Sequence, residues 1–110
     1  MVLYASGTWN SSSDVRKKDI IEKVEASVKQ ISEASIFNYR MKDDKTGVVN
    51  LGTSAQDWQK IFPATVKEMP DGFLGFDYAS AALGASVMAA REIVRLKKRI
   101  EDLEKKIKAS

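Results

Sequence analysis

The stretch IVRLKKRIEDLEKKI, Ile93–Ile107, decides how this chain is expected to fold. Its apolar residues recur at alternating steps of three and four and are called the seam: Ile93, Leu96, Ile100, Leu103 and Ile107. With Ile93 at heptad position a, every a is isoleucine and every d is leucine, the pattern of a parallel coiled coil. Charged residues flank this narrow stripe, so we predict that the seam joins copies of the chain.

Two questions about the seam stay open on pattern alone. A short apolar stripe can also pack against its own domain, because little more than two heptads are present. Ile at a with Leu at d leans towards dimers in isolated parallel coils, so the seam does not fix the number of chains.

The helix that carries the seam is predicted to span 79–110, with the coiled coil over 93–107. This range contains no proline and one glycine, and it is rich in helix-forming Ala, Leu, Lys, Arg and Glu. Small side chains allow close approach, so the first half is expected to pack inside the globular part. Its small residues are Ala79, Ala81, Ala82, Gly84, Ala85, Ala89 and Ala90.

Upstream of this helix, the sequence predicts a small β-meander. The segments 36–41 and 48–54 are β-prone and are joined by a polar loop in which Gly47 suits a positive φ. A short helix over 55–62 is stopped by Pro63, and two further strands surround the turn at 70–72. We expect the aromatic side chains of this region to form the core: Trp58, Phe62, Phe73, Phe76 and Tyr78.

An N-terminal helix is predicted to begin at Ser13 or Asp14, either of which can cap it. A core-facing stripe follows at helical spacing: Ile20, Ile21, Val24, Val28 and Ile31. Residues 1–12 resemble the end of an upstream domain, and 13–78 form the globular part of the next one. The predicted fold class is therefore α+β, with an N-terminal helix, a small meander and a long C-terminal helix.

The composition excludes several kinds of chemistry. The 110 residues include no cysteine and no histidine, so disulfides, thiolate nucleophiles and the commonest metal ligand are absent. We predict no metal site and no cofactor, and any acid-base step must use carboxylate, lysine or tyrosine. No apolar run is long enough to span a bilayer, and no signal peptide is evident, so no membrane partner is expected.

The segment SSSDVRKK, Ser11–Lys18, has two interpretations. Ser and Asp before an apolar-periodic run are most often a helix cap, and a Lys-Lys pair is usually solvated. Alternatively, a deprotonated Lys18 could activate the Ser13 hydroxyl, since adjacent cations disfavour its ammonium form while Asp14 and Asp19 favour it. Residues five apart do not face one another on a helix or a strand, so the pair needs a bend or a second subunit.

The order of these landmarks resembles the C-terminal intramolecular chaperone domains of phage tailspikes, tail fibres and neck appendages, the S74 self-cleaving peptidases. The same domain type occurs in a eukaryotic membrane-tethered transcription factor. The family opens with a Ser-Asp-x-Arg-hydrophobic-Lys pattern, matched by Ser13, Asp14, Arg16 and Lys18, and continues with a helix and a strand around a tyrosine, here Tyr39.

The resemblance continues to about Ile107. A Gly-x-x-Ala-Gln-acidic segment, a Phe-Pro pair, a valine and an Asp-Tyr pair follow in the family's order. They are Gly52, Ala55, Gln56, Asp57, Phe62, Pro63, Val66, Asp77 and Tyr78. The chain departs from the family pattern at Lys17, where many members are apolar, at Ile20, where many have Asn, and at Asp57, where Glu is commoner.

The resemblance implies a homotrimer that helps an upstream fibre or tailspike chain to fold and then cuts itself off at Ser12-Ser13. Ser13 would be the nucleophile and Lys18 its base, with Asp14, Arg16 and Gln56 in support. It also implies a phage virion precursor in the host cytoplasm, from which the chaperone is released after cleavage.

Two alternatives remain. The domain could be a non-cleaving structural trimerisation foot of a phage fibre. It could also be a basic coiled coil that binds nucleic acid, but the net charge is only +3 and Arg91–Lys108 alternates acids with bases and contains no aromatic residue.

Overall fold

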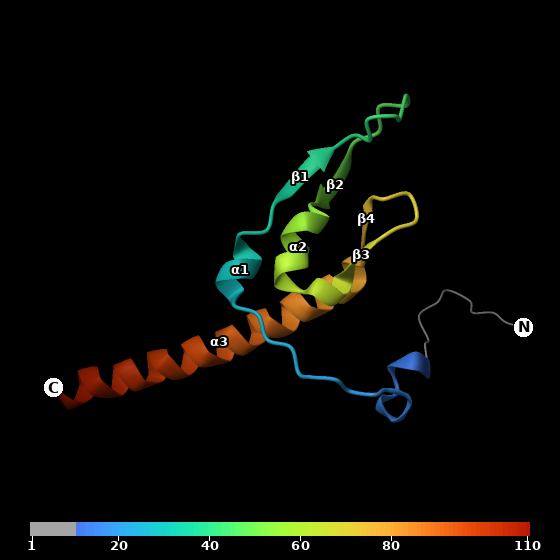
Figure 1. Ribbon diagram of the computed structural model, residues 1–110. Helices are drawn as coiled ribbons and strands as arrows, with labels where there is room; N and C mark the ends of the chain where they lie inside the picture. The colour runs from blue at the N-terminus through green and yellow to red at the C-terminus, as the bar shows by residue number, and fades with distance from the viewer. Residues whose placement is uncertain (1–10) are drawn as a thin grey trace, which may run out of the picture.

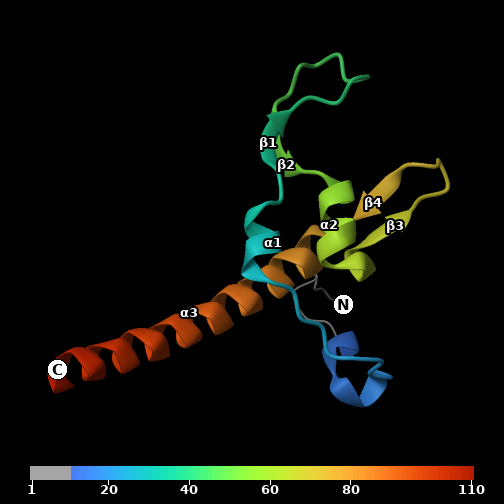
Figure 2. The same cartoon turned by 60° about the vertical axis from the view of Figure 1, so that its left-hand side comes forward.

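One long helix, α3 (Tyr78–Ala109), organises the chain. The computed structural model describes residues 11–110, and it confirms the α+β class (Figure 1). Short helices and strands gather on the first half of α3, and the second half projects from them as a single rod (Figures 1 and 2). The helix predicted over 79–110 is therefore confirmed.

Helix α3 begins at a capped end and passes close beside the body. The Asp77 carboxylate accepts hydrogen bonds from the Ser80 backbone N–H (3.1 Å) and hydroxyl (2.7 Å), which satisfies a donor of the first turn. Ala81 is buried, and a Cβ added at Gly84 would lie 2.9 Å from Cε2 of Phe62. Small residues thus give close packing at these two positions, whereas Ala82 is exposed.

The first hairpin joins β1 (Ile36–Tyr39) to β2 (Asn50–Thr53), antiparallel, with Ile36 opposite Thr53. Gly47 in the connecting loop has φ 74°, as predicted. The Tyr39 ring covers Gly52, where an added Cβ would meet Tyr39 Cε1 at 2.6 Å. This contact explains why glycine stands at that position.

The second hairpin follows α2 (Ala55–Ile61) and a 3₁₀ turn, η3 (Pro63–Thr65). It pairs β3 (Val66–Glu68) with β4 (Leu74–Phe76), and Gly72 in its turn has φ 88°. The predicted meander is wrong in one respect. The strands form two separate two-stranded sheets, because α2 lies between the hairpins and keeps β2 from pairing with β3.

The core of the body is small. Within residues 11–110 the buried apolar side chains are Ile61, Phe62 and Ala81. Trp58 stacks on Phe62 with ring centroids 6.1 Å apart and also contacts Phe76 at 5.7 Å. Trp58, Phe62 and Phe76 thus form an aromatic cluster under α2.

Of the predicted core aromatics, Phe62 is buried, Trp58 and Phe76 are half-buried, and the other two are exposed. Phe73 is 73% exposed because it lies in the turn between β3 and β4. Tyr78, 54% exposed, begins α3 and packs edge-on against Phe76 at 4.7 Å, which leaves its outer face open.

The predicted N-terminal helix is largely wrong. The structure has two 3₁₀ turns, η1 (Ser11–Ser13) and η2 (Val15–Lys17), then an irregular segment over 18–27, and only then α1 (Val28–Ser32). A capping box of Ser27 and Gln30 starts α1. A helix over 18–27 would have no body surface to cover its stripe, and an unpacked helix is marginal in water.

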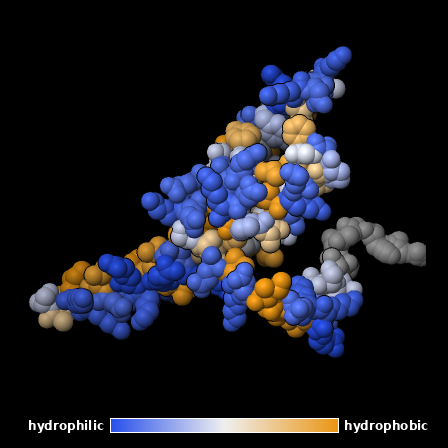
Figure 3. Space-filling view, in the orientation of Figure 1, coloured by the Kyte–Doolittle hydropathy of each residue, from blue (hydrophilic) through white to orange (hydrophobic). Residues whose placement is uncertain are grey.

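The apolar stripe of this segment is consequently exposed: Ile20, Ile21 and Val24. Figure 3 shows apolar surface both here and along α3. The seam of α3 is also exposed, by 47% at Leu103 and up to 72% at Ile107.

The described part of the chain is elongated (Figures 1 and 2). Its accessible surface is 9680 Å² for 12.2 kDa, whereas a compact monomer of that mass exposes about 6,100 Å². The radius of gyration is 19.6 Å, against about 13 Å for a compact domain of this length. Among the described residues, α3 and the other helices are not apolar enough over a sufficient length to cross a membrane.

Candidate functional site

The segment from Ser11 to Lys18 folds as two consecutive turns. The Asp14 backbone N–H donates to the Ser11 carbonyl (3.2 Å), and the Lys17 N–H donates to the Asp14 carbonyl (3.0 Å). The Lys18 N–H closes the second turn on the Val15 carbonyl (3.1 Å). Ser13 therefore lies inside a folded-back stretch, with Lys18 directly after it.

Asp14 and Arg16 pair with one another within these turns. Asp14 Oδ1 accepts from the Arg16 backbone N–H (2.9 Å), and Oδ2 accepts from Arg16 Nη2 (2.7 Å). These bonds to Arg16 lower the pKa of Asp14 below its ordinary value. Asp14 is thus a cap, as the capping interpretation predicted, although it caps the short turn η2 and not a long helix.

The lysine that contacts a serine in this segment is Lys17. Its Nζ donates to Ser11 Oγ at 3.1 Å. Ser13 and Lys18 are both exposed, and in the described part of the chain no hydrogen bond joins their side chains. The pairing of Ser13 with Lys18 stays a prediction.

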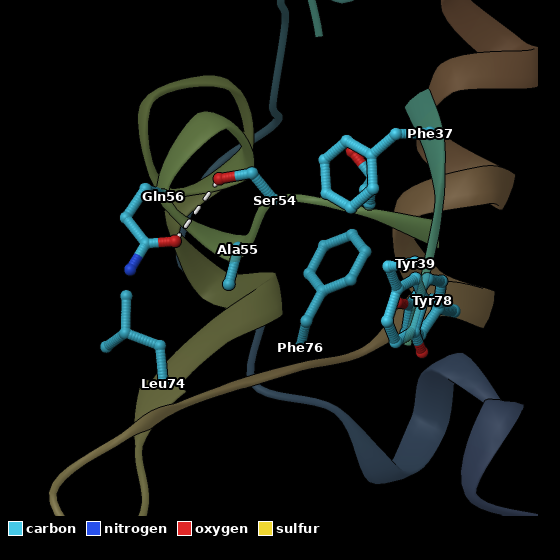
Figure 4. Close-up of a pocket in the computed structure, with 9 residues that line it drawn as sticks. Phe37, Tyr39, Ser54, Ala55, Gln56, Leu74, Phe76 and Tyr78 are labelled. Atoms are coloured by element: carbon cyan, nitrogen blue, oxygen red, sulfur yellow. Dashed lines mark hydrogen bonds between the residues drawn. The ribbon is translucent and has the colours of Figure 1, made fainter. Parts of the chain in front are cut away.

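Gln56 lies on α2, far from Ser13 in the single chain. Figure 1 places α2 in the body and the η1–η2 segment well outside it. Gln56 Oε1 accepts a hydrogen bond from Ser54 Oγ (3.2 Å) at the edge of an open cleft of about 470 Å³ (Figure 4). The other side of that cleft is aromatic: Phe37, Tyr39, Phe76 and Tyr78. The structure therefore does not bring Gln56 to Ser13.

Asp57, the acidic residue of the same motif, has a role that the sequence did not reveal. Its Oδ2 accepts from the Ser35 backbone N–H at 2.9 Å and so fastens α2 to the connection between α1 and β1. This bond is the main reason that the pKa of Asp57 is lowered. Hydropathy periodicity carries no signal for a carboxylate that accepts from a backbone 22 residues away.

Acidic side chains are scattered over the part of the chain that the structure describes. Over residues 11–110, the Asp and Glu side chains form no group of three or more that could hold an ion.

The comparison with protein families bears directly on this segment. The family model described as chaperone of endosialidase, Peptidase_S74, matches residues 13–67, half of the chain. The match begins at Ser13 and ends in β3, so α3 lies outside it. No curated protein matches the chain. The resemblance seen in the motifs is thereby confirmed, and the chain belongs to the peptidase S74 family, the chaperones of endosialidase.

Proposed function

We propose that this chaperone forms a homotrimer, assists the folding of an upstream phage fibre or tailspike chain, and releases itself by autoproteolysis at Ser12-Ser13. The observation that carries the proposal is the seam of α3, which a member of a chaperone family leaves exposed along the whole projecting rod. The work would take place on a virion precursor in the host cytoplasm, and residues 13–110 would be released.

Association gives the exposed surface a partner. Five seam residues at a and d spacing can interdigitate with the same residues of parallel copies, which covers apolar area that the single chain leaves in water. The excess of surface over a compact monomer supports the same conclusion. The number three comes from the resemblance to the trimeric fibre chaperones.

Ser13 contributes the amine side of the bond that is proposed to be cut, and this position determines the course of the reaction. The Ser13 hydroxyl oxygen attacks the Ser12 carbonyl carbon, while its proton passes to the neutral amine of Lys18. The C–N bond then breaks, and Lys18 returns the proton to the departing Ser13 amine, which leaves an ester between Ser12 and the Ser13 oxygen. Water hydrolyses this ester to a Ser12 carboxylate and a restored Ser13 hydroxyl.

Assembly is proposed to complete the dyad. In the single chain the Ser13 and Lys18 side chains are not hydrogen-bonded to each other, and the irregular segment 18–27 connects them to the body. Packing of this segment, with its exposed Ile20 and Ile21, against neighbouring chains would bend it and bring an amine to the hydroxyl. Cutting would then follow correct assembly.

Replacing Ser13 by alanine tests the chemistry. We expect the parent protein to yield two species on a denaturing gel and in mass spectrometry, residues 1–12 and 13–110, and the Ser13→Ala variant to stay intact. N-terminal sequencing of the larger product should begin at Ser13. Sedimentation should give the same trimer for both proteins, because an exposed hydroxyl contributes nothing to the seam.

The second candidate function is a structural trimerisation domain that does not cut. The lack of a Ser13 to Lys18 hydrogen bond in the described chain favours it. Under this function the parent protein and Ser13→Ala would both remain a single intact band while still forming trimers.

A further inference from the structure

Lys17 spans the bond that is proposed to be cut. Ser11 stands two residues before Ser13, and Lys17 stands four residues after it, yet Lys17 Nζ lies 3.1 Å from Ser11 Oγ. The hydrogen bond therefore closes a loop that contains both Ser12 and Ser13. This contact is called the Lys17–Ser11 bridge.

The backbone explains how side chains six residues apart can meet. Successive 3₁₀ turns, closed by the Asp14 N–H on Ser11 and by the Lys17 N–H on Asp14, reverse the chain twice within seven residues. Both bonds have ordinary lengths of 3.2 and 3.0 Å. The bridge thus adds a side-chain link to a segment that its own backbone has already folded.

The pairing of Arg16 with Asp14 leaves Ser11 as the acceptor for Lys17. The Asp14 carboxylate is engaged by Arg16, through Nη2 at 2.7 Å and Nε at 3.1 and 3.2 Å. This fork occupies both oxygens of the carboxylate. The Ser11 hydroxyl is then the acceptor that Lys17 reaches.

We propose that Lys17 is a positioning residue for self-cleavage, which holds the acyl side of the Ser12-Ser13 bond in place through the Ser11 hydroxyl. The inference rests on the proposed function. Lys17 donates a hydrogen bond to the Ser11 hydroxyl, and it is not proposed to accept the proton of Ser13. Its contribution is to limit the rotation of the Ser12 carbonyl, so that the Ser13 oxygen meets it in a reactive orientation.

The position is one at which this chain departs from the pattern it resembles, where many members have an apolar residue. An apolar side chain cannot donate to Ser11. The bridge is therefore a device of this chain and not a requirement of the reaction, and its loss should slow cutting without abolishing it.

The test measures the first-order rate of cleavage of the full chain across pH in four variants. Lys17→Met, Ser11→Ala and the double variant should each cut about 3- to 10-fold more slowly than the parent, as expected for one hydrogen bond. The double variant should be no slower than the single ones, because both remove the same contact. Lys17→Arg should recover the rate, since a guanidinium can donate to Ser11 but cannot serve as a base.

The pH profile separates positioning from catalysis. Ser11→Ala and Lys17→Arg keep the positive charge at position 17 and should keep the parent profile, because the base and its neighbouring charges are unchanged. Lys17→Met and the double variant remove a cation beside Lys18, so their rates are compared on the high-pH plateau, where Lys18 is neutral. Lys23→Met is the matched control: it removes one positive charge from the same exposed stretch and should cut at the parent rate. Circular dichroism and sedimentation of each variant confirm that fold and assembly are retained.

The alternatives give different results. A Lys17→Arg variant that does not cut at any pH would make Lys17 the base and overturn the proposal. Parent rates in Ser11→Ala would also overturn it, while leaving the proposed function intact. A parent protein that forms trimers and never cuts would remove the proposed function itself, and the positioning role with it.

Discussion

Asp57 joins two parts of the body that are distant in sequence. Its bond to the Ser35 N–H favours the ionised carboxylate and lowers its pKa below the ordinary value of 3.8. A group whose pKa is lowered on folding stabilises the fold above its unfolded pKa, and this stabilisation is lost as pH falls through the folded pKa. Asp57 therefore stabilises the protein at neutral pH but not in strong acid.

We expect Asp57→Asn to lower the urea midpoint at pH 7, because a neutral amide is a weaker acceptor for the Ser35 N–H. The difference from the parent should shrink as the pH falls from the ordinary value of 3.8 through the lowered pKa of the folded carboxylate, where the parent Asp57 becomes protonated. Urea unfolding at a fixed protein concentration, followed from pH 7 to pH 2.5, measures both effects. Asp43→Asn, in the loop of the first hairpin, is the control. An equal loss at every pH would contradict the assignment.

Gly84 sets the distance between α3 and the aromatic cluster. A methyl group there would lie 2.9 and 3.0 Å from two ring carbons of the buried Phe62. Overpacking typically costs about 1–3 kcal/mol, and alanine gains about 1 kcal/mol over glycine in a helix. Gly84→Ala should therefore destabilise the protein by about 1 kcal/mol.

Chemical denaturation of Gly84→Ala and of the same change in a Phe62→Leu background provides the check. In the Phe62→Leu protein the ring is gone, so the alanine should stabilise the helix. Destabilisation of similar size in both backgrounds would show that the ring contact is not the cause.

The conformation of a residue could be predicted from the sequence where a few neighbouring residues determine it. Gly47 and Gly72 occupy turn positions with positive φ, which glycine adopts without steric cost because it has no Cβ. Phe73 was assigned to the core and lies in solvent. Burial depends on what the rest of the molecule places over a residue, and the sequence near Phe73 does not contain that information.

At the scale of elements, two apolar stripes with similar periodicity have different outcomes. The stripe of α3 lies on a continuous helix rich in Ala, Leu, Lys and Glu, whose intrinsic preference supports the pattern. The stripe over 20–31 is rich in β-branched residues and is interrupted by the Ser27 capping box, so only α1 is helical. Periodicity predicted an apolar face in both cases, but helix formation needed propensity or packing as well.

The order of strands and helices was predictable, and their association was not. Each hairpin is fixed by its own turn, so both were predicted correctly. Whether two hairpins share a sheet depends on how α2 sits between them. The spacing of the motifs likewise gave the order of Ser13 and Gln56 along the chain. It did not indicate that the two residues lie apart in the folded chain.

Ile100→Lys should dissociate the proposed trimer, because it places a charge at the central a position of the seam. Val94→Lys is the matched control: Val94 is on the same helix, 68% exposed, and off the seam. Sedimentation equilibrium should give a monomer for Ile100→Lys and the parent mass for Val94→Lys. Equal masses for the two variants would mean that the seam does not join the chains.

At the scale of the whole molecule, the described chain has a small hydrophobic core. Its few buried apolar residues and its large accessible surface support the proposal that partners cover α3 and the segment 18–27. No pattern within the seam reveals the number of partners, since the same residues suit more than one oligomer. The proposed number of chains therefore comes from the resemblance to the family and not from the seam.

Cutting should depend on protein concentration if assembly completes the dyad. We expect the fraction cut per unit time to rise with concentration and then to reach a plateau once every chain is in a trimer. Dilution series followed by mass spectrometry measure this dependence, and Ile100→Lys should stay uncut at all concentrations. A rate that is the same from the most dilute sample upward would place the dyad within one chain.

The position of α3 in the sequence would also govern when the proposed assembly can begin. A ribosome makes every other described element before it reaches the residues of this helix. If the seam joins the chains as proposed, a chain whose synthesis stops before α3 would lack the seam and could not assemble. Assembly through α3 would thus select chains whose synthesis has passed this helix.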